Sequence, residues 1–256
     1  MKIAVLIKQV PGSESSLPIN NSQDWIDESS VTFVMNPPDN FALEEALLIK
    51  EANDGSEVVV VSMGPFRVQK VIREGLAKGA DRGIHIKEDD KIEVDPLFIA
   101  QRFADVLKEE SFDLILTGLQ SDDTGMGQTG VLIGEMLGMP TATLAIETNV
   151  LNGQIRVKRE LESGWFQWIQ LPLPASISIQ SGLNTPRYPS LKGIMGAKKK
   201  EIKNIEISDH YSENKNQTID RLFVPETNKK TEIIEGDSDQ IIERIIEVLK
   251  SEIKVI

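Results

Sequence analysis

Short apolar runs alternate with segments of helical periodicity through the first half of the chain. The apolar runs have the length of buried strands and cover residues 1–9, 58–61, 83–86 and 112–117. Between them, apolar side chains recur every three or four residues, as on one face of a helix. These segments lie at residues 42–49, 67–78, 97–107 and 131–137. Because crossovers between parallel strands are right-handed, the alternation predicts an α/β fold: a twisted, mostly parallel sheet with helices on both faces.

Polar residues mark the expected ends of these helices. Asp39 or Asn40 can cap the first helix, and Asp95 can cap the third, with Pro96 at its first position. Acidic and amide side chains accept hydrogen bonds from the free N–H groups of a first helical turn, and proline suits the first position. Gly79 is expected to end the second helix.

The pattern changes to strand-like segments after residue 141. These segments are residues 142–150, 154–161, 165–171 and 175–180. Asn152-Gly153 is a strong two-residue hairpin signal, and residues 162–164 form a second turn. We expect an antiparallel extension at the edge of the parallel sheet, with Trp165, Phe166 and Trp168 on alternating faces of its tip.

The C-terminal part divides into an irregular stretch and a helix. Residues 201–235 are polar and show no helical pattern, whereas residues 237–253 form an amphipathic helix that Asp237 or Ser238 can cap. Such a stretch is either a disordered tail or a segment that gains order on another protein, and the terminal helix favours docking. We therefore expect residues 1–187 to form the α/β domain and residues 188–256 a recognition loop and docking arm.

The candidate binding element is the loop that follows the apolar run at 112–117. It contains Gly118, Gly125, Gly127 and Gly130 and leads into a helix. Glycines leave backbone N–H groups uncovered, and a helix start adds more of them, which is the geometry of a phosphate cradle. The motif is neither a Walker loop nor GxGxxG, so a plain turn is an equally good interpretation. The loops after Gln9 and Met63 should reach the same sheet edge.

Composition excludes several classes of function. The net charge of −12 argues against nucleic acid or an anionic membrane as a partner. The chain has no cysteine and only two histidines, so we expect neither thiolate chemistry nor a metal site. The first apolar run is too short for a membrane span or a signal peptide, so we expect a cytoplasmic protein. No set of acid, base and nucleophile is evident, so we expect no catalytic residues.

Specific motifs along nearly the whole chain resemble one family. They are Met35-Asn36-Pro37, Ala42-Leu43-Glu44-Glu45-Ala46, residues 62–65 and 76–85, Gln128-Thr129-Gly130, residues 157–160 and, most specifically, residues 184–200. The chain resembles the small (beta) subunit of electron-transfer flavoproteins. That resemblance implies an adenine-nucleotide-binding fold, a heterodimer with an alpha subunit that holds the redox FAD, and electron exchange with acyl-CoA or other flavin dehydrogenases and a downstream quinone oxidoreductase.

The resemblance also implies a nucleotide site in this chain. The positions that match the family's nucleotide contacts are Leu6, Asn36, Pro37, Pro38, Asp39, Met63, Gly118, Gln120, Ser121, Asp122, Asp123, Thr124, Gly125, Met126, Gly127, Gln128 and Thr129. Ordinary members bind AMP there, which is structural, and the electron-bifurcating branch binds a second FAD. The loop at residues 121–127 departs from the bifurcating pattern, and Ser13 stands where some members carry an aromatic residue. We predict AMP, with FAD as the alternative.

Two further positions are expected to contact other proteins. Leu191 occupies the place of the family's recognition-loop leucine, and Glu160 belongs to a matching motif. Pro186 and Pro189 should stiffen the approach to Leu191, and Gly193 should loosen the exit, so that the leucine is exposed. Two other functions stay open: an enzyme of the adenine-nucleotide hydrolase type, with Lys8 as a phosphate ligand, and a stand-alone nucleotide-binding regulator.

Overall fold

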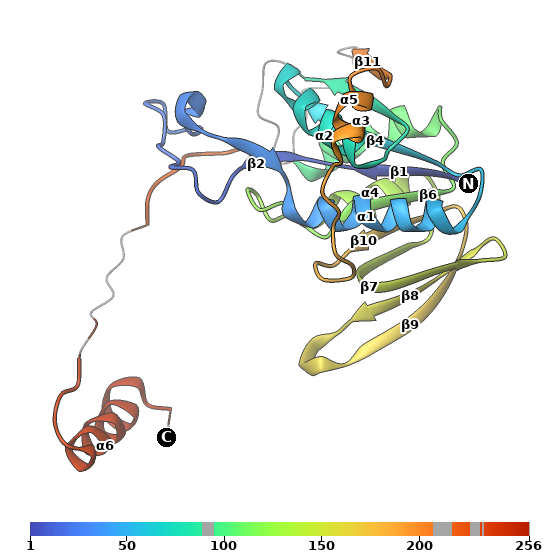
Figure 1. Cartoon of the computed structure of the whole chain (residues 1–256). Coiled ribbons are helices and arrows are strands. Elements are labelled where there is room, and N and C mark those ends of the chain that lie inside the picture. Colours follow the sequence, from blue (N-terminus) through green and yellow to red (C-terminus); the bar gives the residue numbers. More distant parts are fainter. Residues whose placement is uncertain (89–94, 207–216, 226–230, 232, 256) are drawn as a thin grey trace. The chain divides into compact units, whose positions relative to one another are not determined.

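A nine-stranded sheet forms the centre of the chain's larger unit. The computed structural model describes residues 1–88, 95–206, 217–225, 231 and 233–255, and it divides into two compact units, Met1–Arg221 and Leu222–Ile256. The strand order is β11-β5-β4-β1-β6-β10-β7-β8-β9 (Figure 1). The strands are β1 (Lys2–Leu6), β4 (Glu57–Gly64), β5 (Arg82–Lys87), β6 (Leu114–Gly118), β7 (Thr141–Leu151), β8 (Gln154–Glu160), β9 (Phe166–Pro172), β10 (Ala175–Ile179) and β11 (Ile202–Glu206).

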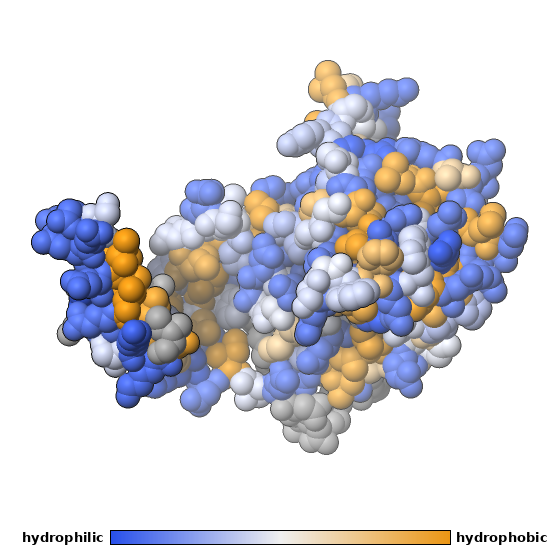
Figure 2. Space-filling view, turned by 90° about the horizontal axis from the view of Figure 1, so that it is seen from below, coloured by the Kyte–Doolittle hydropathy of each residue, from blue (hydrophilic) through white to orange (hydrophobic). Residues whose placement is uncertain are grey.

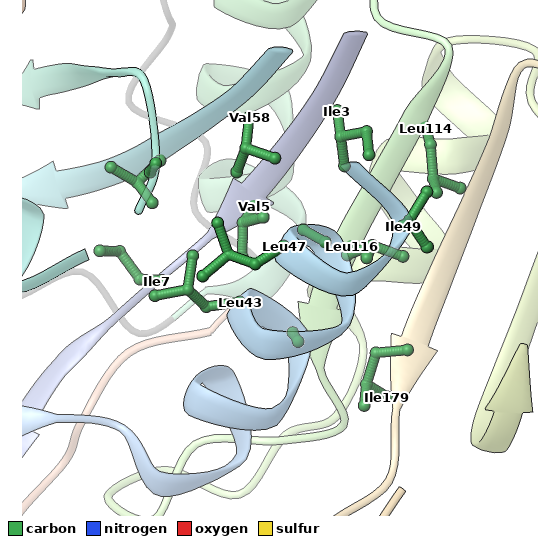
Figure 3. Packing of buried hydrophobic residues seen from close by; sticks show 14 of the residues in the cluster. Ile3, Val5, Ile7, Leu43, Leu47, Ile49, Val58, Leu114, Leu116 and Ile179 are labelled. Carbon is green, nitrogen blue, oxygen red and sulfur yellow. The ribbon is translucent and has the colours of Figure 1, made fainter. Parts of the chain in front are cut away.

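Helices cover both faces of the parallel part of the sheet. One face packs against α1 (Pro37–Ala52), α2 (Gln69–Lys78) and α5 (Leu191–Ala197); the other packs against α3 (Pro96–Lys108) and α4 (Thr129–Met136). β1 shows why its run is continuously apolar: Ile3 and Val5 face α1, whereas Ala4 and Leu6 face the opposite layer. Figure 3 shows the first of these layers, with Leu43 and Leu47 of α1 packed on the strands. The predicted α/β fold is confirmed.

The antiparallel extension is smaller than the sequence predicted. β7 pairs with β8 and β8 with β9 in antiparallel register, as expected. β10 does not belong to this meander: it lies between β6 and β7 and runs parallel to both. All five of its residues are buried. The prediction was wrong here because a short, fully buried run suits the interior of a parallel sheet, where both faces are covered.

A second correction concerns residues 201–235, which the sequence predicted to be irregular. Residues 202–206 form β11, which pairs parallel with β5 at the edge of the sheet. Ile202 packs on one core layer and Ile205 on the other, while the remaining residues of the strand are polar or charged. Charged side chains are typical of an edge strand. The segment at residues 207–216 lies outside the described residues, and the functional division expected after residue 187 stays a prediction.

Smaller elements complete the larger unit. β2 (Gln9–Pro11) and β3 (Phe33–Met35) form an antiparallel pair. Short 3-10 helices lie at Glu28–Ser30, Phe66–Val68 and Glu162–Gly164. Asp95 caps α3 as predicted, because its carboxylate accepts from the Leu97 N–H at 2.9 Å. At α1 the prediction was wrong: the N-cap position is Asn36, and Asp39 lies inside the helix.

The second unit consists mainly of the predicted terminal helix. α6 (Ser238–Glu247) continues as a π-helical segment, Val248–Ile253, and Asp237 and Gln240 form a capping box at its start. None of the residues of α6 is buried, and its apolar stripe includes Ile242, Ile245 and Ile246, which are all exposed. Figure 2 shows this stripe as a hydrophobic strip along the helix. None of the helices among the described residues has the length and apolar character needed to cross a membrane.

The position of β11 leads to a prediction about truncation. A chain that ends at Arg221 should fold like the full-length protein, because the larger unit ends there. A chain that ends at Lys200 loses β11 and with it the partly buried Ile202 and Ile205. Each should cost roughly 1 kcal/mol, about half the value of a fully buried side chain. We expect its midpoint of thermal unfolding, followed by circular dichroism, to fall by about 4–8 °C. Equal midpoints would show that β11 contributes nothing to the sheet.

Candidate functional site

The loops that follow β1, β4 and β6 meet at one edge of the sheet and enclose a cavity of about 800 Å³. Thirteen of the predicted nucleotide contacts line this cavity: Leu6, Asn36, Asp39, Met63, Gly118, Gln120, Ser121, Asp123, Thr124, Met126, Gly127, Gln128 and Thr129. Pro37 and Pro38, at the start of α1, and Asp122 and Gly125, in the loop after β6, do not line it. The structure thus brings together residues that are more than 120 positions apart in the sequence.

The Asp39 carboxylate joins two of these loops. One oxygen accepts from the Lys8 N–H at 2.7 Å, after β1, and the other from the Gly118 N–H at 3.1 Å, at the end of β6. The side chain is therefore not a helix cap but a connection between strand ends. Gly118 is required here because a Cβ atom would lie 2.3 Å from the carboxylate oxygen. Burial raises the pKa of Asp39 to about 7, against the opposing effect of the two N–H donors.

The Asn36 side chain holds the glycine-containing loop in a second place. Its amide nitrogen donates to the Gln120 carbonyl at 3.0 Å, and its amide oxygen accepts from the Asp122 N–H at 3.0 Å. Asn36 is almost fully buried. This double hydrogen bond with two backbone groups fixes the loop relative to the start of α1.

The Lys8 side chain, a candidate phosphate ligand under the hydrolase hypothesis, is engaged within the protein. Its ammonium group lies 2.7 Å from the carboxylate of Asp123 and within 3.4 Å of the hydroxyl groups of Ser121 and Thr124. Burial would raise the pKa of Asp123, but the Lys8 charge and hydrogen bonds outweigh it and hold the pKa below its usual value. The Asp123 charge is thereby neutralised at the cavity wall.

The glycine-containing loop has unpaired backbone N–H groups at the cavity wall. Gly127 and Gln128 line the cavity, and their N–H groups have no hydrogen-bond partner among the described residues. Thr129 follows as the first residue of α4, where the first-turn N–H groups are free and the helix dipole is positive. Gly127 has a φ of +65°, a left-handed conformation that glycine adopts without strain. These features fit an anionic phosphate group.

An aromatic and basic cluster at the cavity wall was not predicted from the sequence. The Arg67 guanidinium lies 3.8 Å from the centre of the Phe33 ring and 3.0 Å from the carboxylate of Glu28. Trp25 donates its indole N–H to the same carboxylate at 3.1 Å, and Arg67 also donates to Gln9 at 2.6 Å. These residues lie in irregular or short elements, so no periodicity marked them. Among the described residues, no group of three or more His, Asp or Glu side chains is arranged to hold a metal ion.

The two positions expected to contact proteins lie outside the cavity. Leu191 is 76% exposed and begins α5, with Ser190 as its N-cap, so the expected loop is a short helix. Gly193 does not loosen the chain: it allows α5 to approach α2 so closely that a Cβ atom would lie 2.2 Å from the Ala77 carbonyl oxygen. Glu160 is the last residue of β8 and accepts a hydrogen bond from Gln180 at 2.9 Å.

Comparison with known proteins agrees with this architecture. The family model described as "Electron transfer flavoprotein domain" matches residues 24–210. The chain belongs to the electron transfer flavoprotein beta subunit family. It is 34% identical to the beta subunit from Methylophilus methylotrophus, with 97% of this chain and 98% of the relative covered. The beta subunits from Bradyrhizobium diazoefficiens (39% identity, 82% and 83% covered) and Bacillus subtilis (33% identity, both chains fully covered) are also similar.

The buried Asp39 predicts a dependence of stability on pH. In the unfolded chain its pKa is the ordinary 3.8, whereas the folded pKa is about 7. Between pH 4 and pH 7 the folded protein therefore holds a proton that the unfolded chain has lost, and stability decreases as the pH rises. Asp39→Asn lacks this titration. We expect the difference in free energy of unfolding, wild type minus Asp39→Asn, to decrease by up to about 1.4 kcal/mol per pH unit in this window.

Urea unfolding of both proteins at pH 4.5, 5.5, 6.5 and 8 measures this difference. The contributions of all other titrating groups cancel in this difference, because both chains contain them. A difference that stays constant from pH 4.5 to 6.5 would show that Asp39 is already ionised in the folded protein.

Proposed function

We propose that this chain is the beta subunit of a heterodimeric electron carrier that binds AMP, supports the FAD of an alpha subunit and docks flavin dehydrogenases. The observation that carries the nucleotide part is the free N–H groups of Gly127 and Gln128 at the start of α4, on a cavity of about 800 Å³. Backbone donors and the Thr129 hydroxyl would hold the phosphate, without a basic side chain. AMP has no redox role here, and the carrier chemistry belongs to the FAD held mainly by the alpha subunit.

The terminal helix supports the assignment of a partner chain. Unit Leu222–Ile256 presents Ile242, Ile245 and Ile246 on an exposed stripe and buries none of the residues of α6. An amphipathic helix without its own core gains stability by laying its apolar face on another protein. We assign the alpha subunit as that protein, since the family is that of beta subunits. Dehydrogenases would donate electrons to the complex, and a quinone oxidoreductase would accept them.

One observation favours the alternative in which this chain binds a second FAD. The cavity extends past the glycine-containing loop to Trp25, Phe33, Phe66 and Arg67, which offer apolar and cationic contacts to a larger ligand. The hydrolase alternative has less support, because the Lys8 ammonium group is paired with Asp123. Mass spectrometry of the nucleotide released on denaturing the purified complex separates these possibilities. AMP with one FAD per complex supports our proposal, whereas two FAD, or ATP or ADP in place of AMP, contradicts it.

Gly127→Val should remove the bound nucleotide. A Cβ atom at this position would have room, since its nearest neighbour would be the Leu119 carbonyl oxygen at 3.5 Å. The left-handed φ of +65° is instead the obstacle, because a β-branched residue strains there by about 1–3 kcal/mol and would turn the N–H groups away. We expect nucleotide content, measured by mass spectrometry, to fall by about tenfold or more.

Gly138→Val is the matched control for this experiment. Gly138 has the same φ of +65°, no atom within 4 Å of its Cβ position, and does not line the cavity. It should destabilise the fold by a similar amount but keep its nucleotide. Full nucleotide content in the Gly127 variant would exclude this loop as the phosphate site.

Leu191→Ala should slow electron transfer from a dehydrogenase. Burying a leucine side chain in a partner's pocket is worth roughly 1.5–3 kcal/mol, a large share of a weak, transient complex. We therefore expect about a tenfold slower reduction of the complex by a cognate dehydrogenase. Leu151→Ala is the matched control, since Leu151 is a similarly exposed leucine (66%) at the end of β7. Reduction by dithionite, flavin content and heterodimer stability should stay unchanged; an unchanged enzymatic rate would count against docking through Leu191.

A further inference from the structure

The segment that carries Leu191 is fastened to the α/β fold on both sides. Arg187 precedes α5 and contacts α1, whereas the residues after α5 contact α2. Between these two attachments, Tyr188, Leu191 and Met195 are exposed to solvent. The exposed fractions of these side chains are 94%, 76% and 66%. An apolar surface of this kind is presented in one orientation only if both attachments hold.

The attachment on the N-terminal side is a buried carboxylate. The Glu44 carboxylate of α1 accepts from the Arg187 guanidinium, from Nη2 at 2.8 Å and from Nε at 2.9 and 3.1 Å, and also from the Arg187 backbone N–H at 3.0 Å. Only 7% of the Glu44 side chain is exposed, against 57% for Glu51, which binds the same guanidinium at 2.6 Å. The hydrogen bonds with Glu44, and to a smaller extent that with Glu51, raise the pKa of Arg187 and keep the side chain charged.

The attachment on the C-terminal side involves α2. The Arg73 guanidinium donates to the carbonyl groups of Ala197 and Lys200 at 2.6 and 2.7 Å. Lys200 donates in turn to the Leu76 carbonyl at 3.0 Å, near the end of α2. Gly193 lets the two helices lie in contact. On the N-terminal side, Asn184 also donates to the Phe41 carbonyl and the Glu45 carboxylate of α1, at 3.0 and 3.1 Å. The Arg187–Glu44 pair lies closer to α5 in the sequence than this attachment, and a conservative substitution can remove it.

We propose that Glu44 and Arg187 are positioning residues, which fix α5 so that Leu191 is presented to a redox partner in one orientation. This rests on the proposed docking role of Leu191. The bidentate geometry matters more than the charge, because a planar guanidinium and a carboxylate define both distance and angle. Holding a contact side chain in its bound conformation improves affinity by reducing the ordering cost on binding. Glu44 thus acts on docking through Leu191 and touches no partner itself.

Glu44→Gln in the intact heterodimer tests the proposal. The KM for the heterodimer as electron acceptor of a dehydrogenase should rise at least about threefold, with kcat unchanged, since orientation affects association and not the flavin. Glu51→Gln is the matched control: it removes the exposed partner of the same guanidinium, and exposed pairs contribute little. Its KM should stay within about twofold of the wild-type value. Arg187→Lys keeps the positive charge but lacks the planar guanidinium, so its effect should resemble that of Glu44→Gln. If Glu44→Gln folds poorly, Arg187→Lys takes its place, because the lysine ammonium group still pairs with the buried Glu44 carboxylate.

Combination with Leu191→Ala distinguishes positioning from a separate contact. If Glu44 acts through Leu191, Glu44→Gln should have almost no further effect in a Leu191→Ala background. If the double variant raised the KM by the product of the two single effects, the proposal would be overturned.

Hydrogen exchange provides a readout that needs no dehydrogenase. The amides of residues 193–197 in α5 should exchange about tenfold faster in Glu44→Gln than in Glu51→Gln, because the segment next to α5 has lost its attachment to the buried Glu44 carboxylate. Unchanged exchange in both Glu44→Gln and Arg187→Lys would overturn the positioning role, whatever the kinetics. Faster exchange combined with normal kinetics of Leu191→Ala would instead show that docking does not use Leu191, which refutes the proposed docking function.

Discussion

A buried carboxylate, that of Asp39, connects the elements that form the cavity. The Asp39 carboxylate accepts hydrogen bonds from the Lys8 N–H, just after β1, and from the Gly118 N–H, at the end of β6. The backbone of Asp39 belongs to α1. The end of β1, the end of β6 and the start of α1 are therefore held together at Asp39, although Gly118 is 79 residues away from it in the sequence. A buried carboxylate without such donors would be strongly unfavourable, and unpaired N–H groups at a buried strand end would be as well. The hydrogen bonds thus offset the cost of burying both the carboxylate and the two N–H groups. Gly118 allows its backbone to approach Asp39 closely because it has no Cβ atom.

α1 connects this point to the surface that carries Leu191. Asn36 and Asp39 at its start organise the cavity, and Glu44, one to two turns further along, holds Arg187. Leu43 and Leu47 anchor the same helix in the core. One helix therefore determines the geometry of two separate surfaces. Substitutions that shift α1 along its axis would disturb both surfaces together, whereas changes in α3 or α4 would reach only the cavity.

The sequence predicted elements more accurately than their arrangement. Helices and strands with strong periodicity were found because their signal is local, and the cap at Asp95 follows from its neighbours alone. The place of β10 between β6 and β7 depends on pairing across the sheet, which no local pattern encodes. β11 was missed because only Ile202 and Ile205 are apolar in a polar segment. Asp39 had the signature of a helix cap, and only the folded chain shows it buried among N–H donors; the nucleotide contacts themselves stay a prediction.

The strand order has a consequence for how this protein is made. β6 ends at Gly118, but its neighbour on one side, β10, begins only at Ala175. During synthesis from the N-terminus, β6 therefore has an unpaired edge until the meander β7–β9 has been completed and β10 can insert. Exposed edges of apolar strands pair readily with other chains, and parallel pairing over long separations is slow. The nascent chain is thus most prone to aggregation between the appearance of β6 and that of β10, a window that variants with a slowly forming β7–β9 meander would lengthen.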